Sequence, residues 1–334
     1  MGRYAVVRTL FIILILFVCL MERKFEVPVL LIFFCRDEVL RQVFECVKKV
    51  RPTKLYLYQD GARRESDMPG IQACRDIVSQ VDWECEVHTF YQDKNVGCDP
   101  SEYIAQKWMF ETEDRGIVLE DDDIVSDSFF YFCEELLEKY KDDERINMIC
   151  GMNHLGHYDK SGTSYIFTKT GAITGWASWK RVIDTWDPNY SFVDDEYQKY
   201  CLKNLLGKYY DRVFNTWKKQ KESGKAHYEG ILGSSMYLNN RLNIVPTCNL
   251  VKNIGLTTDA THSTGTLNTM PRAHRCIFFA PIYELEFPLK HPKTVTEDIG
   301  YQKLIYAIVA PSPIVKFFRR VEGRLYRMFP FLGK

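Results

Sequence analysis

The sequence predicts an α/β fold with a mostly parallel, doubly wound sheet, and three observations support this prediction. An almost continuous apolar run over 27–35 is typical of a strand buried on both faces. Strand patterns then alternate with helical patterns as far as residue 111. A further apolar strand, 116–119, runs directly into four carboxylates at 120–123. Repeated strand–helix alternation requires crossovers, which make the neighbouring strands parallel.

Each element of this first half has its own signal. Asp37 caps a helix that carries apolar residues at helical spacing, and 54–59 is a second strand closed by Asp60 and Gly61. A helix over 69–81 and a third strand over 83–91 follow. Pro100 stands in the first turn of a helix over 100–111, where its missing N–H costs nothing. After the acids, Ser126 is the candidate N-cap of a helix rich in phenylalanine.

The second half is less regular. We expect strands at 146–151 and 243–246, and one or two helices over 196–221. Together with the sequence ends, this divides the chain into four parts: an apolar N-terminal segment over 1–24, an alternating half over 25–151, a less regular half over 152–300, and a basic amphipathic tail over 301–334.

Composition excludes several classes of protein. The chain has 334 residues, 46% of them hydrophobic, and 44 basic residues balance 44 acidic ones. Zero formal charge argues against nucleic-acid binding, which needs a basic excess. Neither the GxGxxG dinucleotide fingerprint nor the GxxxxGK[ST] phosphate loop is present. The 11 cysteines lack CxxC spacing, which favours reduced cytosolic thiols over a disulfide framework.

The acidic run is the most informative motif. Glu120, Asp121, Asp122 and Asp123 repel one another at a strand end, where open α/β sheets bind ligands. A hard cation, Mn²⁺ or Mg²⁺, relieves this repulsion and shares its oxygen ligands with phosphates. A solvated acidic loop is the alternative.

Both ends of the chain suggest a membrane. Residues 9–21 are uncharged and mostly apolar, which is short for a bilayer span. A short signal anchor, a true start at Met21 and a cleaved signal peptide all remain open. Over 313–332, bulky apolar residues at helical spacing are interleaved with five basic ones. Such a helix either lies on an anionic membrane or packs on the core with a solvated basic face. With reduced cysteines, these features place the protein in the cytoplasm, at the inner face of the cell membrane.

The acidic segment 118–132 resembles the Glu-Asp-Asp segment of the eukaryotic mannosyl-glycoprotein N-acetylglucosaminyltransferase I family. It is closer still to bacterial family 2-like nucleotide-diphospho-sugar transferases, which also carry segments similar to 95–98, 175–179, 253–255 and 259–262. The resemblance covers roughly residues 27–300 and implies a GT-A fold. It further implies a metal-dependent hexosyl- or N-acetylhexosaminyltransferase that acts with inversion. The half over 25–151 would bind a nucleotide-diphospho-sugar, and 152–300 would bind a glycan or lipid-linked acceptor.

The resemblance also implies roles for residues of the donor half. Asp122 matches the metal ligand and Asp121 the nucleotide contact, although an Asp-x-Asp pattern would choose Asp121 and Asp123. Arg36 is similar to an arginine that lies along the uridine, and Asp60 to an aspartate that accepts from the uracil imide. A surface charge and an ordinary turn are their alternatives. Asn95 stands in a loop that either places amides near the nucleotide or only turns.

In the acceptor half, the resemblance implies a catalytic base, a metal contact and a sugar platform. Glu229 occupies the place of the family's aspartate base, one methylene longer, and the pair Asp194–Asp195 is the runner-up unless it caps a helix. His262 completes the metal site or touches the diphosphate, or is only a loop histidine. Trp176 and Trp179 form a surface for stacking a sugar, or belong to the core.

Two further classes compete with a glycosyltransferase. A sugar-nucleotide pyrophosphorylase shares the sheet and the metal, but needs a Gly-rich basic loop after the first strand, and 34–37 is not one. A membrane-associated binding protein with a degenerate transferase fold is the alternative that is not an enzyme. The intact acids argue against it, while glutamate at position 229 keeps it open.

Overall fold

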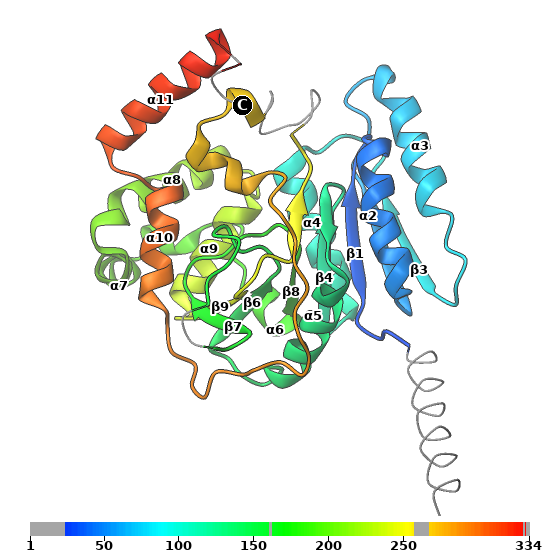
Figure 1. Cartoon of the computed structure of the whole chain (residues 1–334), viewed down its shortest axis with the longest axis horizontal. Coiled ribbons are helices and arrows are strands. Elements are labelled where there is room, and N and C mark those ends of the chain that lie inside the picture. The colour runs from blue at the N-terminus through cyan, green and yellow to red at the C-terminus, as the bar shows by residue number, and fades with distance from the viewer. Residues whose placement is uncertain (1–23, 160–161, 257–266, 330, 332–334) are drawn as a thin grey trace, which may run out of the picture.

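The computed structural model describes residues 24–159, 162–256, 267–329 and 331 (Figure 1). Its centre is an eight-stranded sheet in the order β3-β2-β1-β4-β8-β6-β9-β7. Helices lie on both sides of this sheet, so the expected α/β class with a mostly parallel sheet is confirmed.

The first half alternates as predicted. Its elements are β1 (Val29–Phe33), α2 (Asp37–Val50), β2 (Lys54–Gln59), α3 (Met68–Val78), β3 (Glu86–Tyr91), α4 (Cys98–Thr112) and β4 (Arg115–Glu120). Strands β3, β2, β1 and β4 are parallel neighbours. The chain passes from β1 outward to β3 and then returns to place β4 on the other side of β1. The strand order therefore reverses between β1 and β4.

The second half extends the same sheet. Strand β8 (Trp176–Trp179) is antiparallel to both β4 and β6 (Ile146–Cys150). Beyond β6 lie β9 (Leu242–Pro246) and β7 (Tyr165–Thr168), which pair antiparallel with each other. A separate two-stranded sheet joins β5 (Asp123–Val125) to β10 (Val251–Asn253). The sequence did not predict the antiparallel insertion of β8.

The remaining helices complete the layers. They are α5 (Asp127–Lys139), α6 (Lys180–Ile183), α7 (Glu196–Leu206), α8 (Tyr210–Ser223), α9 (Tyr228–Leu238), α10 (Ile299–Val309) and α11 (Pro313–Met328). The region 196–221 thus forms two helices, one of the two arrangements expected. Helix α11 lies at the edge of the molecule, beyond α10 (Figure 1).

The sheet separates two hydrophobic cores. Along β1, Val29, Leu31 and Phe33 belong to one core, and Leu30 and Ile32 to the other. Helices α2, α3 and α5 contribute to the first core, and α4, α9 and α10 to the second. This alternation explains why the sequence of β1 is continuously apolar: both of its faces are covered.

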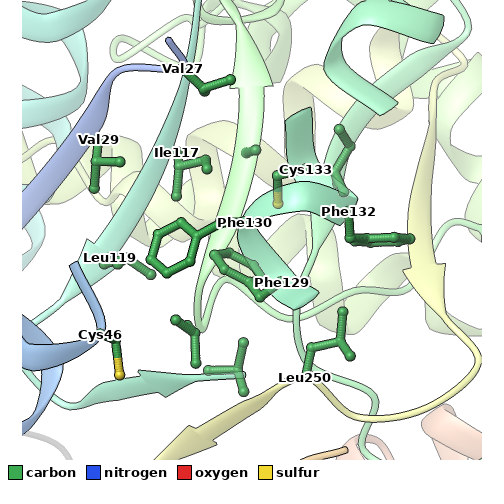
Figure 2. Packing of buried hydrophobic residues seen from close by; sticks show 14 of the residues in the cluster. Val27, Val29, Cys46, Ile117, Leu119, Phe129, Phe130, Phe132, Cys133 and Leu250 are labelled. Atoms are coloured by element: carbon green, nitrogen blue, oxygen red, sulfur yellow. The ribbon is translucent and has the colours of Figure 1, made fainter. Parts of the chain in front are cut away.

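Helix α5 fixes the end of β4. Figure 2 shows the rings of Phe129 and Phe130 beside Ile117 and Leu119 of β4, and all four side chains are buried. Ser126 holds the N-cap position, but its side chain does not cap the helix. The carboxylate of Glu284 instead accepts hydrogen bonds from the N–H groups of Asp127 and Ser128. A distant acid therefore supplies the cap that the local sequence suggested.

The acidic run contains a turn between two strands. Strand β4 ends at Glu120, Asp121 and Asp122 form a turn, and β5 begins at Asp123. A turn lets consecutive carboxylates point in directions that a strand would not allow.

Among the residues that the structure describes, no helix is both long and apolar enough to cross a bilayer. The predicted N-terminal segment 1–24 lies almost entirely outside those residues.

We predict that Phe129→Ala lowers the free energy of unfolding by about 3–5 kcal/mol, because it removes a fully buried ring between β4 and β10. Chemical denaturation measures this loss. Tyr131→Ala on the same helix, where the side chain is 42% exposed, is the control and should cost clearly less. Equal losses would contradict the packing described here.

Candidate functional site at the carboxyl ends of β1, β2 and β4

A cavity of about 370 Å³ opens where the strand order reverses. Its walls come from the segments that follow β1, β2 and β4, from the start of α4 and from the first turn of α9. Ligands of open α/β sheets bind at such a reversal, since the two diverging connections leave a crevice there. The volume lies in the range of small-molecule sites.

Six of the residues to which the resemblance gave roles line this one cavity, although they lie far apart in the chain. They are Arg36, Asp60, Asn95, Asp121, Asp122 and Glu229.

Arg36 bridges the two strands at the reversal. It follows β1, and its guanidinium donates to both carboxylate oxygens of Asp121 and to Oδ2 of Asp122, the latter at 2.9 Å. The side chain is 20% exposed. Burial alone would lower the pKa of Arg36, but the two carboxylates raise it overall, so the guanidinium stays charged. The alternative of a plain surface charge is therefore wrong for Arg36.

Asp122 is held from the opposite side by β10 and the loop after it. Asn253 Nδ2 donates to Asp122 Oδ1 at 3.0 Å, and the N–H of Ile254 donates to the Asp122 carbonyl at 2.9 Å. A Cβ on Gly255 would lie 1.9 Å from Asp122 Oδ2. Only glycine at position 255 therefore leaves room for this carboxylate to face the cavity.

Two glutamates add negative charge that Arg36 does not balance. Glu102 on α4 and Glu120 at the end of β4 both line the cavity. Burial, followed by the charges of Asp123 and Asp121, raises the pKa of Glu102 well above its usual range. Burial, followed by the charge of Glu102, does the same for the pKa of Glu120. Burial also raises the pKa of Asp121 to about 6, although Arg36 opposes this.

Asp60 links two loops at the rim. Its Oδ1 accepts from the N–H groups of Gly61 and Val96, and its Oδ2 accepts from the N–H of Gly97 and from Asn95 Nδ2, all at 2.8–3.0 Å. These donors occupy the lone pairs of the carboxylate. Asp60 and Asn95 thus shape the cavity by joining the loops after β2 and β3, which matches the turn alternative for both residues.

Glu229 faces the acids from the start of α9. Its side chain is exposed and lines the cavity, and the position in the first turn favours its negative charge through the helix dipole. The preceding His227 bonds Asp99 on α4 through Nδ1 at 3.0 Å and Ser223 on α8 through Nε2 at 2.9 Å. The start of α9 is therefore fixed to two neighbouring helices.

Trp176 and Trp179 cannot stack a sugar. They are 1% and 3% exposed, and they belong to the two opposite cores. Both lie on β8, where side chains three positions apart point to opposite faces. The platform prediction is wrong, and the core alternative is correct.

The other predicted residues that the structure describes do not line the cavity. Asp123 Oδ2 accepts from the N–H groups of Glu120 and Gly175, and this anchors the turn from within. Asp195 caps α7 by accepting from the N–H of Gln198, so the capping alternative holds for Asp195, and Asp194 instead pairs with Lys221. His262 lies outside the described residues.

Sequence analysis missed Glu102 and Asn253 as site residues. Glu102 stands in a helix whose apolar pattern is weak, so no periodicity indicated which face meets the acids. In the sequence, Asn253 stands out only as part of 253–255, which is similar to a segment of the bacterial transferases. Its amide is directed at Asp122 because β10 pairs with β5, Asn253 opposite Asp123.

The donor set fits a divalent cation that shares its ligands with a substrate. Among the described residues, no three His, Cys, Asp or Glu side chains converge to hold a metal ion by themselves. Asp121 and Asp122 are nonetheless hard oxygen donors that line the cavity beside Glu102 and Glu120. Mg²⁺ and similar ions bind through one or two carboxylates together with phosphate oxygens.

Comparison with known proteins returned structural matches only. No protein-family model matches the chain, and no curated protein is significantly similar in sequence. UDP-glucose pyrophosphorylase complexed with UDP-glucose aligns over 67% of this chain and 91% of its own, at 7% identity and a TM-score of 0.36. An active-site mutant of LgtC aligns over 86% of this chain and 99% of its own, at 9% identity and 0.34.

A third match is the 4-diphosphocytidyl-2C-methyl-D-erythritol synthase of Anaerococcus prevotii DSM 20548. It aligns over 64% of this chain and 99% of its own, at 12% identity and a TM-score of 0.30. All three scores lie below 0.5, so the fold class rests on the strand order and the helical layers described above.

We predict that Glu102→Gln raises the melting temperature in metal-free buffer at pH 8 by about 1–3 °C. A carboxyl whose folded-state pKa is raised destabilises the fold at pH values above its unfolded pKa, and the neutral amide removes that cost. The gain should shrink as the pH falls toward about 4.3, where the unfolded chain also binds the proton.

Differential scanning fluorimetry across this pH range measures the effect. Glu111→Gln is the control, because Glu111 is an exposed residue on the same helix. A gain that does not depend on pH would contradict the electrostatic cause.

Proposed function

We propose that the protein is a metal-dependent glycosyltransferase that moves a sugar from a nucleotide-diphospho-sugar to a glycan or lipid-linked acceptor, with inversion at the anomeric carbon. The observation that carries this proposal is the meeting of Arg36 with Asp121 and Asp122 at the reversal of strand order, inside a cavity of substrate size. These residues follow strands β1 and β4. Their contacts are polar, and none of the three residues belongs to either hydrophobic core.

The charges support a donor that brings both negative phosphates and a cation. Arg36 is the guanidinium best placed to face a phosphate or a nucleotide, and a planar guanidinium suits both. Asp122, with Asp121 beside it, would hold Mn²⁺ or Mg²⁺ together with the diphosphate. The ion, when bound, stabilises the negative charge of the departing nucleoside diphosphate.

Glu229 is the residue that we assign as the catalytic base. Inverting transfer needs one carboxylate that takes the proton from the acceptor hydroxyl as its oxygen attacks the sugar. Glu229 is an exposed carboxylate in the first turn of α9 that lines the same cavity as the turn of acids.

The first experiment is a ligand screen with product analysis. Purified full-length protein is tested with UDP-, GDP-, dTDP- and CMP-sugars with and without Mn²⁺, and the products are separated. Release of a nucleoside diphosphate in the presence of glycan or lipid-linked acceptors supports transfer. Formation of nucleotide sugar from a nucleoside triphosphate and a sugar 1-phosphate would instead identify a pyrophosphorylase, and binding without turnover on any acceptor would identify a degenerate binding protein.

We predict that Asp122→Asn reduces the Mn²⁺-dependent part of nucleotide-sugar affinity on the order of 100-fold or more, since even outer-shell changes at metal sites cost 10–100-fold. Isothermal titration with and without the metal measures this part. The control is Asp127→Asn, five positions along, where the carboxylate is exposed and pairs with Lys49. If metal-dependent affinity survives in Asp122→Asn, the assignment of this ligand is wrong.

We predict that Glu229→Gln lowers the transfer rate by about 10²–10⁴ while donor affinity stays near that of the wild type, because the amide cannot accept the proton. Single-turnover kinetics and donor titration separate the two quantities. Glu222→Gln on α8, an exposed glutamate outside the cavity, should change neither. Turnover near the wild-type rate in Glu229→Gln would remove the base role from this residue.

A further inference from the structure

Helix α11 presents an apolar stripe to solvent. Phe317 and Phe318 are 61% and 64% exposed, and Ile314 and Met328 are 69% and 63% exposed. At 100° per residue, these positions and those of Val321 and Leu325 fall on one side of the helix. A helix of this pattern normally turns its apolar side to the core. The stripe is therefore exposed rather than packed, and the core-packing alternative is wrong for the part of 313–332 that forms α11.

The opposite side of α11 attaches it to the body. Gly323 and Tyr326 are buried, and a Cβ on Gly323 would lie 3.3 Å from Pro271. Glu322 pairs with Arg272 at 2.9 Å, and Arg319 donates to the carbonyls of residues 307 and 308. The attachment uses polar contacts and one close backbone approach. It fixes the helix with its apolar stripe outward.

Positive charge borders the stripe. Lys316, Arg320, Arg324 and Arg327 are exposed on α11. The helix contains one acid, Glu322, and its charge is already paired with Arg272. The exposed surface of α11 thus combines bulky apolar groups with four cations on one helix. Arginine and lysine at the edge of an apolar stripe reach headgroup phosphates while the stripe enters the acyl boundary.

We propose that α11 docks the protein on the surface of an anionic lipid bilayer, with the stripe of Ile314, Phe317, Phe318, Val321, Leu325 and Met328 inserted below the headgroups. Charge favours this occupant over a second copy of the chain. Two α11 helices facing each other would bring their cations together without acids to balance them, whereas anionic headgroups supply the opposite charge.

The position of α11 suits a surface-bound substrate. The short helices η4 (Leu267–Thr269) and η5 (Arg272–Ile277) lie beneath α11. The end of this segment, Ile277 and Phe278, lines the cavity. One continuous stretch, 267–278, therefore joins the docking helix to the cavity wall.

The test measures hydrogen exchange of the full-length chain with vesicles of neutral phosphatidylcholine and with vesicles that contain anionic phosphatidylglycerol. A local measurement is needed because the uncharged run 9–21 also has affinity for lipid. We expect amides of 313–328 to exchange more slowly with anionic vesicles only, and this protection to fall as salt rises. Vesicle flotation gives the apparent partition coefficient in parallel.

Variants assign the effect to the stripe and its charges. Arg320→Gln with Arg324→Gln should lower the α11-dependent partition coefficient about fivefold per removed charge. Phe317→Ser with Phe318→Ser should lower it roughly tenfold or more. All four side chains are exposed, so the fold should be retained, and the melting temperature checks this.

Matched controls are Lys218→Gln with Lys219→Gln on α8, and Tyr197→Ser with Tyr200→Ser on α7, which remove exposed charges and exposed rings elsewhere. Unchanged exchange over 313–328 with anionic vesicles overturns the proposal. Protection that is equal with neutral vesicles and insensitive to salt also overturns it. Analytical sedimentation tests self-association. A dimer that the phenylalanine substitutions dissociate, with no protection by vesicles, would assign the stripe to self-association instead.

Discussion

The ion pair between Arg36 and the turn Asp121–Asp122 is the interaction on which the cavity depends. Five carboxylates, on Glu102, Glu120, Asp121, Asp122 and Asp123, influence one another electrostatically there. Arg36 is the cation that contacts two of them. Isolated buried charges are costly, so the guanidinium lowers the free-energy cost of burying the carboxylates of the turn. Arg36 does not neutralise all five carboxylates. After burial, the repulsion that remains among them contributes to the raised pKa values of Glu102 and Glu120.

The sheet register determines where this pair forms. Ile32 of β1 lies opposite Glu120 of β4, so the chain after each strand leaves the sheet at the same level. Arg36 and Asp121 then meet across the reversal. Asp123 anchors the turn through two backbone N–H groups, and the packing of α5 on β4 holds the strand end in place. Buried apolar packing thus sets the geometry of the charged groups above it.

Local signals in the sequence predicted most of the first half and placed the acidic run at the carboxyl ends of the parallel strands, whereas the roles of the other predicted wall residues came from the family resemblance. Short apolar runs and turn residues indicate the alternation of strands and helices. Residues that follow parallel strands lie at the same edge of the sheet. Non-local pairing could not be predicted in this way. Trp176 and Trp179 are core residues because β8 inserts antiparallel between β4 and β6, and no pattern near position 176 states its partner. Glu102 was missed for a similar reason, since the side of α4 that meets the acids depends on packing.

The orientation of helix α11 also depends on contacts that the sequence pattern does not predict. Its amphipathic pattern is identical whether the apolar side faces the core or the solvent, so the sequence left both alternatives open. Contacts on the opposite side decide the matter: Gly323 lies close to Pro271, and Glu322 pairs with Arg272. Both partners belong to the segment that continues to Ile277 and Phe278 in the cavity wall. The attachment that turns the stripe outward is therefore also the attachment that fixes its position relative to the cavity. The segment 267–278 thus contacts α11 at one end and lines the cavity at the other, together with Asp121, Asp122 and Glu229.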